Sequence, residues 1–91
     1  MKVSIIIPSI NPTCKKIFFT LKSVLRNTGH YEVILVLQKT NTNTVNKIKK
    51  EFSKNIKLKI IYDKGQGISR ARNLAIKSAS GDWIILIDDD V

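Results

Sequence analysis

The sequence is poor in the side chains that most often perform catalysis or bind transition metals. Its 91 residues contain one cysteine, Cys14, and one histidine, His30. No disulfide can therefore form within the chain, and no Cys/His spacing typical of a zinc site is present. A Ser-His-Asp or Cys-His site would need His30, which we interpret as a turn residue between a helix and a strand. Cys14 lies on the apolar stripe of a predicted helix, where we expect it to be buried.

Long apolar runs are also missing. No stretch approaches the ~20 residues that a membrane-spanning helix needs. The first apolar run ends at Pro8 and leads to no small-residue cleavage site, so we do not interpret it as a signal peptide. We expect a cytoplasmic chain, or the cytoplasmic part of a longer one, with the inner face of the membrane as an alternative location.

Acidic residues are few and unevenly placed. The chain has 16 Lys and Arg against seven Asp and Glu, a net charge of +9, and four of the acids fall in the last ten residues. A basic module that binds nucleic acid is one alternative function. The lysines between 47 and 59 alternate with apolar residues, which favours a solvated helix face, and no aromatics interleave with them as a stacking platform. We expect no specific nucleic acid partner. An anionic small molecule, a lipid-linked partner or a negatively charged membrane surface fits the charge about as well.

Hydrophobic periodicity predicts four strands that alternate with three helices. Continuous apolar runs indicate strands buried on both faces, and apolar residues at three- and four-residue spacing indicate helices. We expect Asn11 to cap the first helix, with Pro12 at its first position and Gly29 at its end. The predicted strands are 3–7, 31–37, 56–63 and 82–88, and the later helices are 44–54 and 68–79.

This alternation predicts an α/β fold in a single domain, 1–91. We expect three layers (αβα) around a mainly parallel, four-stranded, Rossmann-like half sheet with strand order 3-2-1-4. The third strand, which alternates before it turns apolar, should lie near a sheet edge. In this order the carboxyl ends of strands one and four are neighbours at the switch point where such folds bind ligands. "PSIN" (8–11) and "DDD" (88–90) should therefore meet in one crevice.

The triple acid is the most distinctive motif. In a strand, Asp88 and Asp90 point to one side and Asp89 to the other. Two carboxylates at a strand end suit a hard cation such as Mg²⁺ or Mn²⁺. The alternative is an acidic strand end that is simply solvated.

The loop "DKGQGISRARN" (63–73) contains Gly65-x-Gly67 but no third glycine, because Arg70 stands there. It also follows the third strand, so the dinucleotide-binding fingerprint fails. Arg70 and Arg72 cannot share a helix face. One interpretation is that Arg72 contacts ligand; the other is that it forms a salt bridge with the acids.

These segments together resemble family 2 glycosyltransferases. "VSIIIPSIN" (3–11) is similar to the family's first strand, which ends in Pro-Thr-Tyr-Asn, and "SVL" (23–25) to the end of its first helix. "GISRARNLAIKSASGDWIILIDDD" (67–90) is similar to its Gly-x-x-x-Ala-Arg-Asn, Ala-x-Gly-acid-aromatic and Asp-x-Asp elements. The resemblance covers essentially the whole chain and implies the nucleotide-sugar-binding part of a GT-A fold. It implies metal-assisted transfer of a sugar from a nucleotide-sugar donor to an acceptor hydroxyl.

The resemblance also implies roles for single residues. Pro8, Ser9 and Asn11 would line the base and ribose of the donor. Arg72 and Asn73 would border the pocket. Asp88 and Asp90 match the Asp-x-Asp pair, near the ribose and the metal-bound diphosphate respectively. Asp89 completes the expected donor set, and Asp88 and Asp90 are the expected metal ligands for Mg²⁺ or Mn²⁺.

The sequence departs from the family pattern at three points. Family members usually end the second strand with Asp-Asp-Gly-Ser, whereas "LQKT" (37–40) has no acid, so the resemblance leaves the base of the donor open. Gln38 remains as a residue that could bond a base edge. Ile10 replaces the usual Tyr. The family's general base and acceptor-binding elements lie after the Asp-x-Asp strand, so we expect them to be absent and the 91-residue fragment to be inactive by itself.

Two further expectations concern the last strand. With one edge unpaired, its apolar segment Trp83–Ile87 favours self-association. "LIDDDV" (86–91) is also similar to the Asp-x-Asp signature of haloacid-dehalogenase-type phosphatases, with Asp88 as nucleophile and Asp90 as general acid. That signature normally follows the first strand of its domain, so the phosphatase is the weaker alternative.

Overall fold

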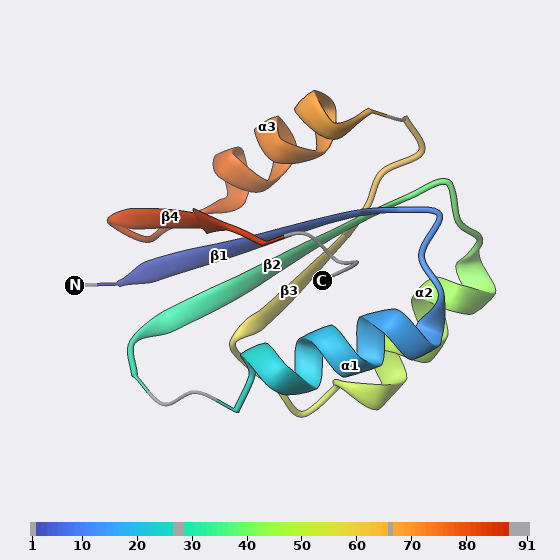
Figure 1. Cartoon of the computed structure of the whole chain (residues 1–91), viewed down its shortest axis with the longest axis horizontal. Helices are drawn as coiled ribbons and strands as arrows, with labels where there is room; N and C mark the ends of the chain where they lie inside the picture. The colour runs from blue at the N-terminus through green and yellow to red at the C-terminus, as the bar shows by residue number, and fades with distance from the viewer. Residues whose placement is uncertain (1, 27–28, 66, 88–91) are drawn as a thin grey trace.

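A computed structural model describes residues 2–26, 29–65 and 67–87 of the chain. Strands and helices alternate along it, as Figure 1 shows. The strands are β1 (Val3–Ile10), β2 (Tyr31–Gln38), β3 (Leu58–Tyr62) and β4 (Trp83–Leu86), and the helices are α1 (Cys14–Val24), α2 (Thr42–Glu51) and α3 (Ile68–Ser78). No helix in these described ranges has the length and apolar character to cross a bilayer.

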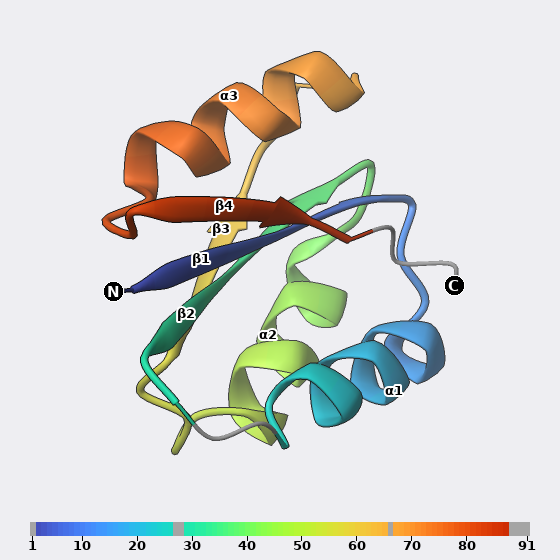
Figure 2. The ribbon, with the colours of Figure 1, turned by 60° about the vertical axis from the view of Figure 1, so that its left-hand side comes forward.

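The four strands form one parallel sheet in the order β3-β2-β1-β4. This order and the α/β class confirm the prediction, including the position of β3 at an edge. Helices α1 and α2 lie on one face of the sheet and α3 on the other (Figures 1 and 2). The result is the expected three-layer arrangement, in which the central strands β1 and β2 are covered on both faces.

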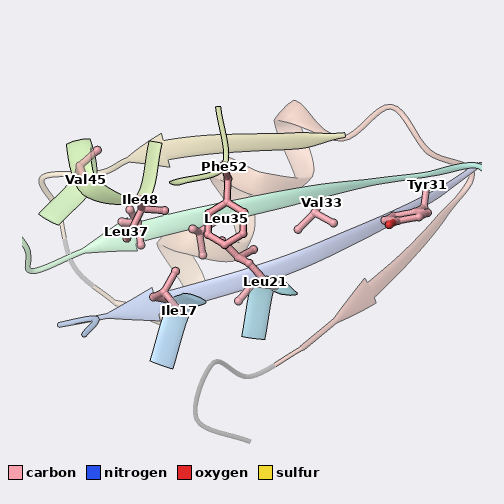
Figure 3. Packing of buried hydrophobic residues seen from close by; sticks show 10 residues of the cluster. Ile17, Leu21, Tyr31, Val33, Leu35, Leu37, Val45, Ile48 and Phe52 are labelled. Atoms are coloured by element: carbon pink, nitrogen blue, oxygen red, sulfur yellow. The ribbon is translucent and has the colours of Figure 1, made fainter. Parts of the chain in front are cut away.

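The core has two parts because the sheet has two covered faces. On the larger side, Leu35 and Leu37 of β2 pack against Ile17 and Leu21 of α1 and against Ile48 of α2 (Figure 3). The smaller part holds Ile6, Ile34 and Val36 against alanines of α3. Successive strand residues point to opposite faces, so the continuous apolar run of β2 supplies both sides. All eight residues of β2 are buried.

The start of α1 differs from the prediction. β1 continues to Ile10, and Asn11 takes a left-handed conformation with φ 55° while its N–H donates to the Gln38 carbonyl at 2.8 Å. The N-cap is Thr13, whose hydroxyl accepts from the Lys16 N–H. The predicted cap at Asn11 and the predicted first helical position at Pro12 were therefore wrong, because the backbone pairing of β1 with β2 reaches Asn11, two residues before the observed cap.

Cys14 also differs from the expectation. It is the first residue of α1 and is only half-buried. The helix packs on the sheet through Ile17 and Leu21, one and two turns further on. The prediction of a fully buried cysteine was wrong, because Cys14 lines an open groove together with Phe18 of α1 and Lys47 of α2.

β4 is the least covered strand. It pairs with β1 through Val3–Ile6, and its four side chains are between 44% and 60% exposed. Apolar edge strands template pairing with other chains. Self-association through this edge stays a prediction.

We expect the apparent mass in sedimentation velocity to rise with concentration for the unchanged chain, and Ile85→Lys to keep it monomeric. Ile56→Lys, at a residue that is 97% exposed and outside the sheet, is the control and should behave as the unchanged chain. A monomer at every concentration would contradict the prediction.

The amino ends of the strands are joined by a buried carboxylate. Glu32 of β2 accepts from the Ser4 hydroxyl (2.6 Å) and the Ser80 N–H (2.7 Å), and pairs with Lys59 of β3 (3.0 Å). Burial by itself raises the pKa of Glu32, but the hydrogen bonds from Ser4, Ser80 and Lys59 outweigh it and lower the pKa from 4.5 to about 2. Glu32 thus ties β1, β3 and the α3–β4 connection to β2.

The same α3–β4 connection contains Gly81, at a point where its backbone lies against β1. Its N–H donates to the Ser4 hydroxyl at 2.9 Å, and a Cβ at this position would lie 2.8 Å from the Ser4 backbone nitrogen. Any side chain at this position would therefore force the start of β4 away from β1.

Glu32→Gln should reduce the free energy of unfolding at pH 7 by about 1–3 kcal/mol, because the amide loses charge-assisted hydrogen bonds in a buried site. The folded pKa is depressed, so the stabilisation is present above pH 4.5 and is lost as the pH falls toward 2. Urea unfolding at pH 7 and pH 3 should therefore show a smaller pH dependence in Glu32→Gln than in the unchanged chain. Glu51→Gln, at an exposed end of α2, is the control; an equal loss there would contradict the assignment.

Candidate functional site

The carboxyl ends of the central strands lie together, as the strand order predicted. Pro8, Ser9 and Ile10 pair with Val36, Leu37 and Gln38 on one side of β1. On the other side β4 pairs only as far as Leu86 opposite Ile6, and the Ile87 N–H donates to the Ile6 carbonyl at 2.9 Å. The last residues of β1 therefore extend beyond the end of β4.

The residues expected in this crevice are only partly described. Pro8 and Ser9 are buried at the end of β1, and Asn11 is exposed where the chain turns toward α1. Asp88, Asp89 and Asp90 lie outside the described residues, one to three positions after Ile87. Within the described ranges, no group of three His, Cys, Asp or Glu side chains is arranged to hold a metal.

A polar cluster that the sequence reasoning missed lies at the carboxyl ends of β2 and β3. Gln38 is fully buried, and its Nε2 donates to Asp63 Oδ2 at 2.8 Å. The same carboxylate accepts from the Gly65 N–H (3.0 Å) and pairs with Arg70 Nε (2.9 Å). Asp63 directly follows β3, and the strand order 3-2-1-4 makes β3 the neighbour of β2. An acid at this strand end was therefore the sequence signal that could have predicted the contact with Gln38.

The hydrogen bonds of this cluster shift the pKa values of both Asp63 and Arg70. The hydrogen bond from Arg70, followed by that from Gln38, lowers the pKa of Asp63 from 3.8 to about 2. Asp63 in turn raises the pKa of Arg70. Since Nε2 of Gln38 is committed to Asp63, its remaining polar group is Oε1, which is buried and has no hydrogen-bond partner in the described structure. A buried unpaired acceptor is uncommon in native folds.

The two arginines of α3 have different surroundings. Arg70 forms the ion pair with Asp63, and its side chain is still 58% exposed. Arg72 is half-buried, and its Nε is a buried donor with no partner among the residues described. The sequence left Arg72 between a ligand contact and a salt bridge with the acids. In the described part of the chain, Arg70 forms the ion pair with Asp63, and Nε of Arg72 donates no hydrogen bond.

Asn73 lies on a different face of α3 from Arg72. It is exposed and lines, with Arg70, Leu74 and Lys77, a shallow depression of about 420 Å³ on α3. Residues three and four apart share a helix face, which places Asn73 with Arg70 and Lys77. Of the two α3 residues expected at the pocket border, Arg72 is therefore the one with a buried polar atom to satisfy.

Comparisons with known proteins agree with this geometry. The sequence pattern of Glycosyl transferase family 2 matches residues 4–91. An uncharacterized glycosyltransferase of Rickettsia bellii (strain RML369-C) is 33% identical over 92 residues, covering 98% of this chain and 13% of that protein. One of Rickettsia conorii (strain ATCC VR-613 / Malish 7) is 34% identical over 89 residues, with 98% and 15% covered. The chain thus spans about one seventh of the length of these curated relatives.

Two solved structures have the same fold. The mannosyltransferase PcManGT from Pyrobaculum calidifontis, in complex with GDP-Man and Mn²⁺, superposes with a TM-score of 0.84 at 20% identity, covering 97% of this chain and 27% of that one. S. aureus TarS 1–349, in complex with UDP, superposes with a TM-score of 0.79 at 27% identity, with 99% and 28% covered. Because the family pattern extends over residues 4–91 and relatives share a third of their residues with nearly the whole chain, the chain belongs to glycosyltransferase family 2.

Proposed function

We propose that the chain forms the nucleotide-sugar donor site of a glycosyltransferase that transfers a sugar to an acceptor hydroxyl. The observation that carries the proposal is the parallel pairing of β1 with both β2 and β4, which makes the carboxyl ends of β1 and β4 neighbours. Open parallel sheets bind ligands at such a switch point. The complexes of PcManGT with GDP-Man and of TarS with UDP support a nucleotide donor.

The donor set that we propose follows the crevice. Pro8, Ser9 and Asn11 line the base and ribose. Arg72 has a buried Nε without a partner among the described residues, and phosphate oxygens are acceptors that match a guanidinium donor. The remaining members of the set are Asn73 at the pocket border and the acids Asp88 and Asp89.

A divalent cation, Mg²⁺ or Mn²⁺, fits this donor set. The described residues hold no other cluster that would compete for it. The chain passes from Ile87, still bonded to Ile6, into Asp88 and Asp90, and carboxylate oxygens are the ligands that such hard cations prefer. Bound there, the cation would neutralise negative charge on the diphosphate leaving group. Mn²⁺ is present in the PcManGT complex.

Every residue of this set is assigned to the donor or to the metal, and none is assigned the role of general base toward an acceptor hydroxyl. We therefore propose that the 91 residues alone bind donor and metal and do not turn over. The acceptor is left unassigned. Membership of the glycosyltransferase family removes the reason to propose a phosphatase role for Asp88 and Asp90.

Gln38 is the residue that we propose faces the base of the donor. The family carries an acid after this strand, and here the nearby acid is Asp63, which is already bonded to Gln38, Gly65 and Arg70. Asp63 fixes the orientation of the Gln38 amide, because the carboxylate accepts only from Nε2. Oε1 is then the group available to a base N–H, and a ring N–H of uracil or guanine would satisfy that acceptor.

Calorimetry with UDP, GDP, ADP and CDP, each with and without Mn²⁺, tests the donor site. We expect one nucleoside diphosphate to bind best and its affinity to depend on Mn²⁺, since the cation links the diphosphate to the acids. Asp88→Asn combined with Asp90→Asn should weaken binding about tenfold or more, whereas Asp82→Asn, at the opposite end of β4, should not. Nucleotide binding that is indifferent to Mn²⁺ and to the paired substitution would contradict the proposal. Binding to random RNA with a steep salt dependence, in place of nucleotide binding, would favour the basic nucleic-acid module.

Gln38→Glu tests the bond to Asp63. A second carboxylate would stand at the 2.8 Å contact, so we expect the free energy of unfolding at pH 7 to fall by about 1–3 kcal/mol. Lowering the pH toward 4 should reduce the loss, because one proton shared by the two carboxyls restores a hydrogen bond. Asn46→Asp, an exposed amide-to-acid change on α2, should cost little at either pH. Urea unfolding measures both, and equal stability of Gln38→Glu and the unchanged chain at pH 7 would rule out the role assigned to this bond.

A further inference from the structure

Most of the net positive charge of the chain falls in the segment that contains α1 and α2. Ten of the 16 Lys and Arg residues fall between 11 and 57, the segment that contains α1 and α2, against two acids. One of these acids, Glu32, is buried at the amino ends of the strands and already paired with Lys59 and Ser4. Glu51 is therefore the one exposed acid of this segment among the residues described.

The outer side of α1 combines this charge with an exposed aromatic ring. Ile17 and Leu21 face the sheet and are fully buried, whereas Phe19 is 69% exposed. Lys15 and Lys22 lie four residues before and three residues after Phe19, so they share its helix face. A Phe side chain in water among lysines does nothing for the core, since the packing of α1 is complete without it.

Between α1 and α2 there is a groove of matching character. Phe18 packs edge-to-face on Phe52 of α2, with ring centroids 5.7 Å apart. The groove is about 460 Å³ in volume and is lined by Cys14 and Phe18 as well as by Lys47, Lys50 and Glu51. It has apolar walls and a mainly cationic rim, and it opens on the side of the helices that is turned away from the sheet, since Val45 and Ile48 of α2 are the buried positions. Figure 2 shows α1 and α2 side by side beneath the sheet.

We propose that this outer surface, which we call the α1–α2 face (Lys15, Phe19, Lys22, Lys47 and Lys50), binds an anionic lipid bilayer. Lysines above an inserted aromatic ring are the pattern of helices that lie in a membrane interface. Each Lys that reaches an anionic surface strengthens the partition about fivefold. The inference stands apart from the donor site, because none of these residues belongs to the crevice.

A membrane fits the α1–α2 face better than a nucleic acid does. Single-stranded nucleic acids need a row of aromatic side chains on which successive bases stack, and here Phe19 is alone at the surface of α1 while Phe18 and Phe52 pack on each other. The cations that define the face are lysines, which bind phosphate as point charges and not bidentately. The apolar walls of the groove suit acyl chains or glycerol backbones, not a polyanion.

The test is co-sedimentation of the chain with vesicles of phosphatidylcholine alone or with 30% phosphatidylglycerol at about 0.1 M salt. We expect binding only to the anionic vesicles. Lys15→Gln with Lys22→Gln should weaken it on the order of tenfold or more. The matched control, Lys64→Gln with Lys77→Gln, removes the same charge beside α3 and should change it less than threefold. Phe19→Ser should weaken binding several-fold and make the remaining binding more sensitive to salt.

Far-ultraviolet circular dichroism on each variant separates loss of the surface from loss of the fold, and these exposed sites should all stay folded. Lys47→Gln with Lys50→Gln provides an independent second variant on α2 with the same expected loss. Equal loss in the α3 control would overturn the proposal, because it would show a general charge effect. Failure to bind anionic vesicles, or binding to random RNA at the same salt that exceeds vesicle binding, would overturn it too.

Discussion

The structure depends on the parallel pairing of β1 between β2 and β4. β1 pairs along all eight residues with β2 but only over Val3–Ile6 with β4. Because β4 ends at Leu86, the carboxyl end of β1 pairs on one side only among the described residues. The donor site that we propose is a consequence of this unequal pairing. Helices α1, α2 and α3 stabilise it by covering the two faces of the central strands.

Two buried carboxylates join the strands at opposite ends of the same sheet. Glu32 connects β1, β3 and the α3–β4 connection at the amino ends, and Asp63 connects β2 to α3 at the carboxyl ends. Hydrogen bonds lower the pKa of each to about 2. Both are therefore ionised in the folded chain at neutral pH and are compensated by several donors, as burial of a charge requires. The difference between them is that the Asp63 cluster contains a buried acceptor, Oε1 of Gln38, that has no partner among the described residues, whereas the side chains bonded to Glu32 include no such atom.

The α1–α2 layer has separate inner and outer roles. Its inner residues form the larger core, and its outer residues carry most of the excess positive charge together with Phe19. Packing on the sheet requires only the apolar residues on the inner side of each helix. The lysines and Phe19 on the outer side are therefore a separate feature of the sequence. If the α1–α2 face lies on a bilayer, the sheet stands between that bilayer and α3, and the crevice opens at the side of the assembly, where the carboxyl ends of the strands lie.

Much of the fold could be read from the sequence because the pattern of apolar residues is strong. The continuous runs in β1 and β2 required burial on both faces, and βαβ alternation allows few topologies. Local signals were less reliable at boundaries: Asn11 and Pro12 have the composition of a helix start, but β1 continues to Ile10 and the Asn11 N–H bonds to the Gln38 carbonyl, so α1 is capped later, at Thr13. The family motifs identified the segments of the donor site. They did not identify Asp63, whose neighbours Gln38 and Arg70 come from other elements, and Asp88–Asp90 stay a prediction.

The sequence by itself determined the elements, their order and the sign and location of the charge, since these depend on residue type and spacing within short segments. Tertiary structure decided which polar groups meet. Asp63 is 25 residues from Gln38 and seven from Arg70, and Glu32 is 48 residues from Ser80. Such contacts depend on the register of neighbouring strands and on how each helix lies across them. A one-residue shift in register turns a side chain to the other face, so the partners of buried charges emerged only from the folded chain.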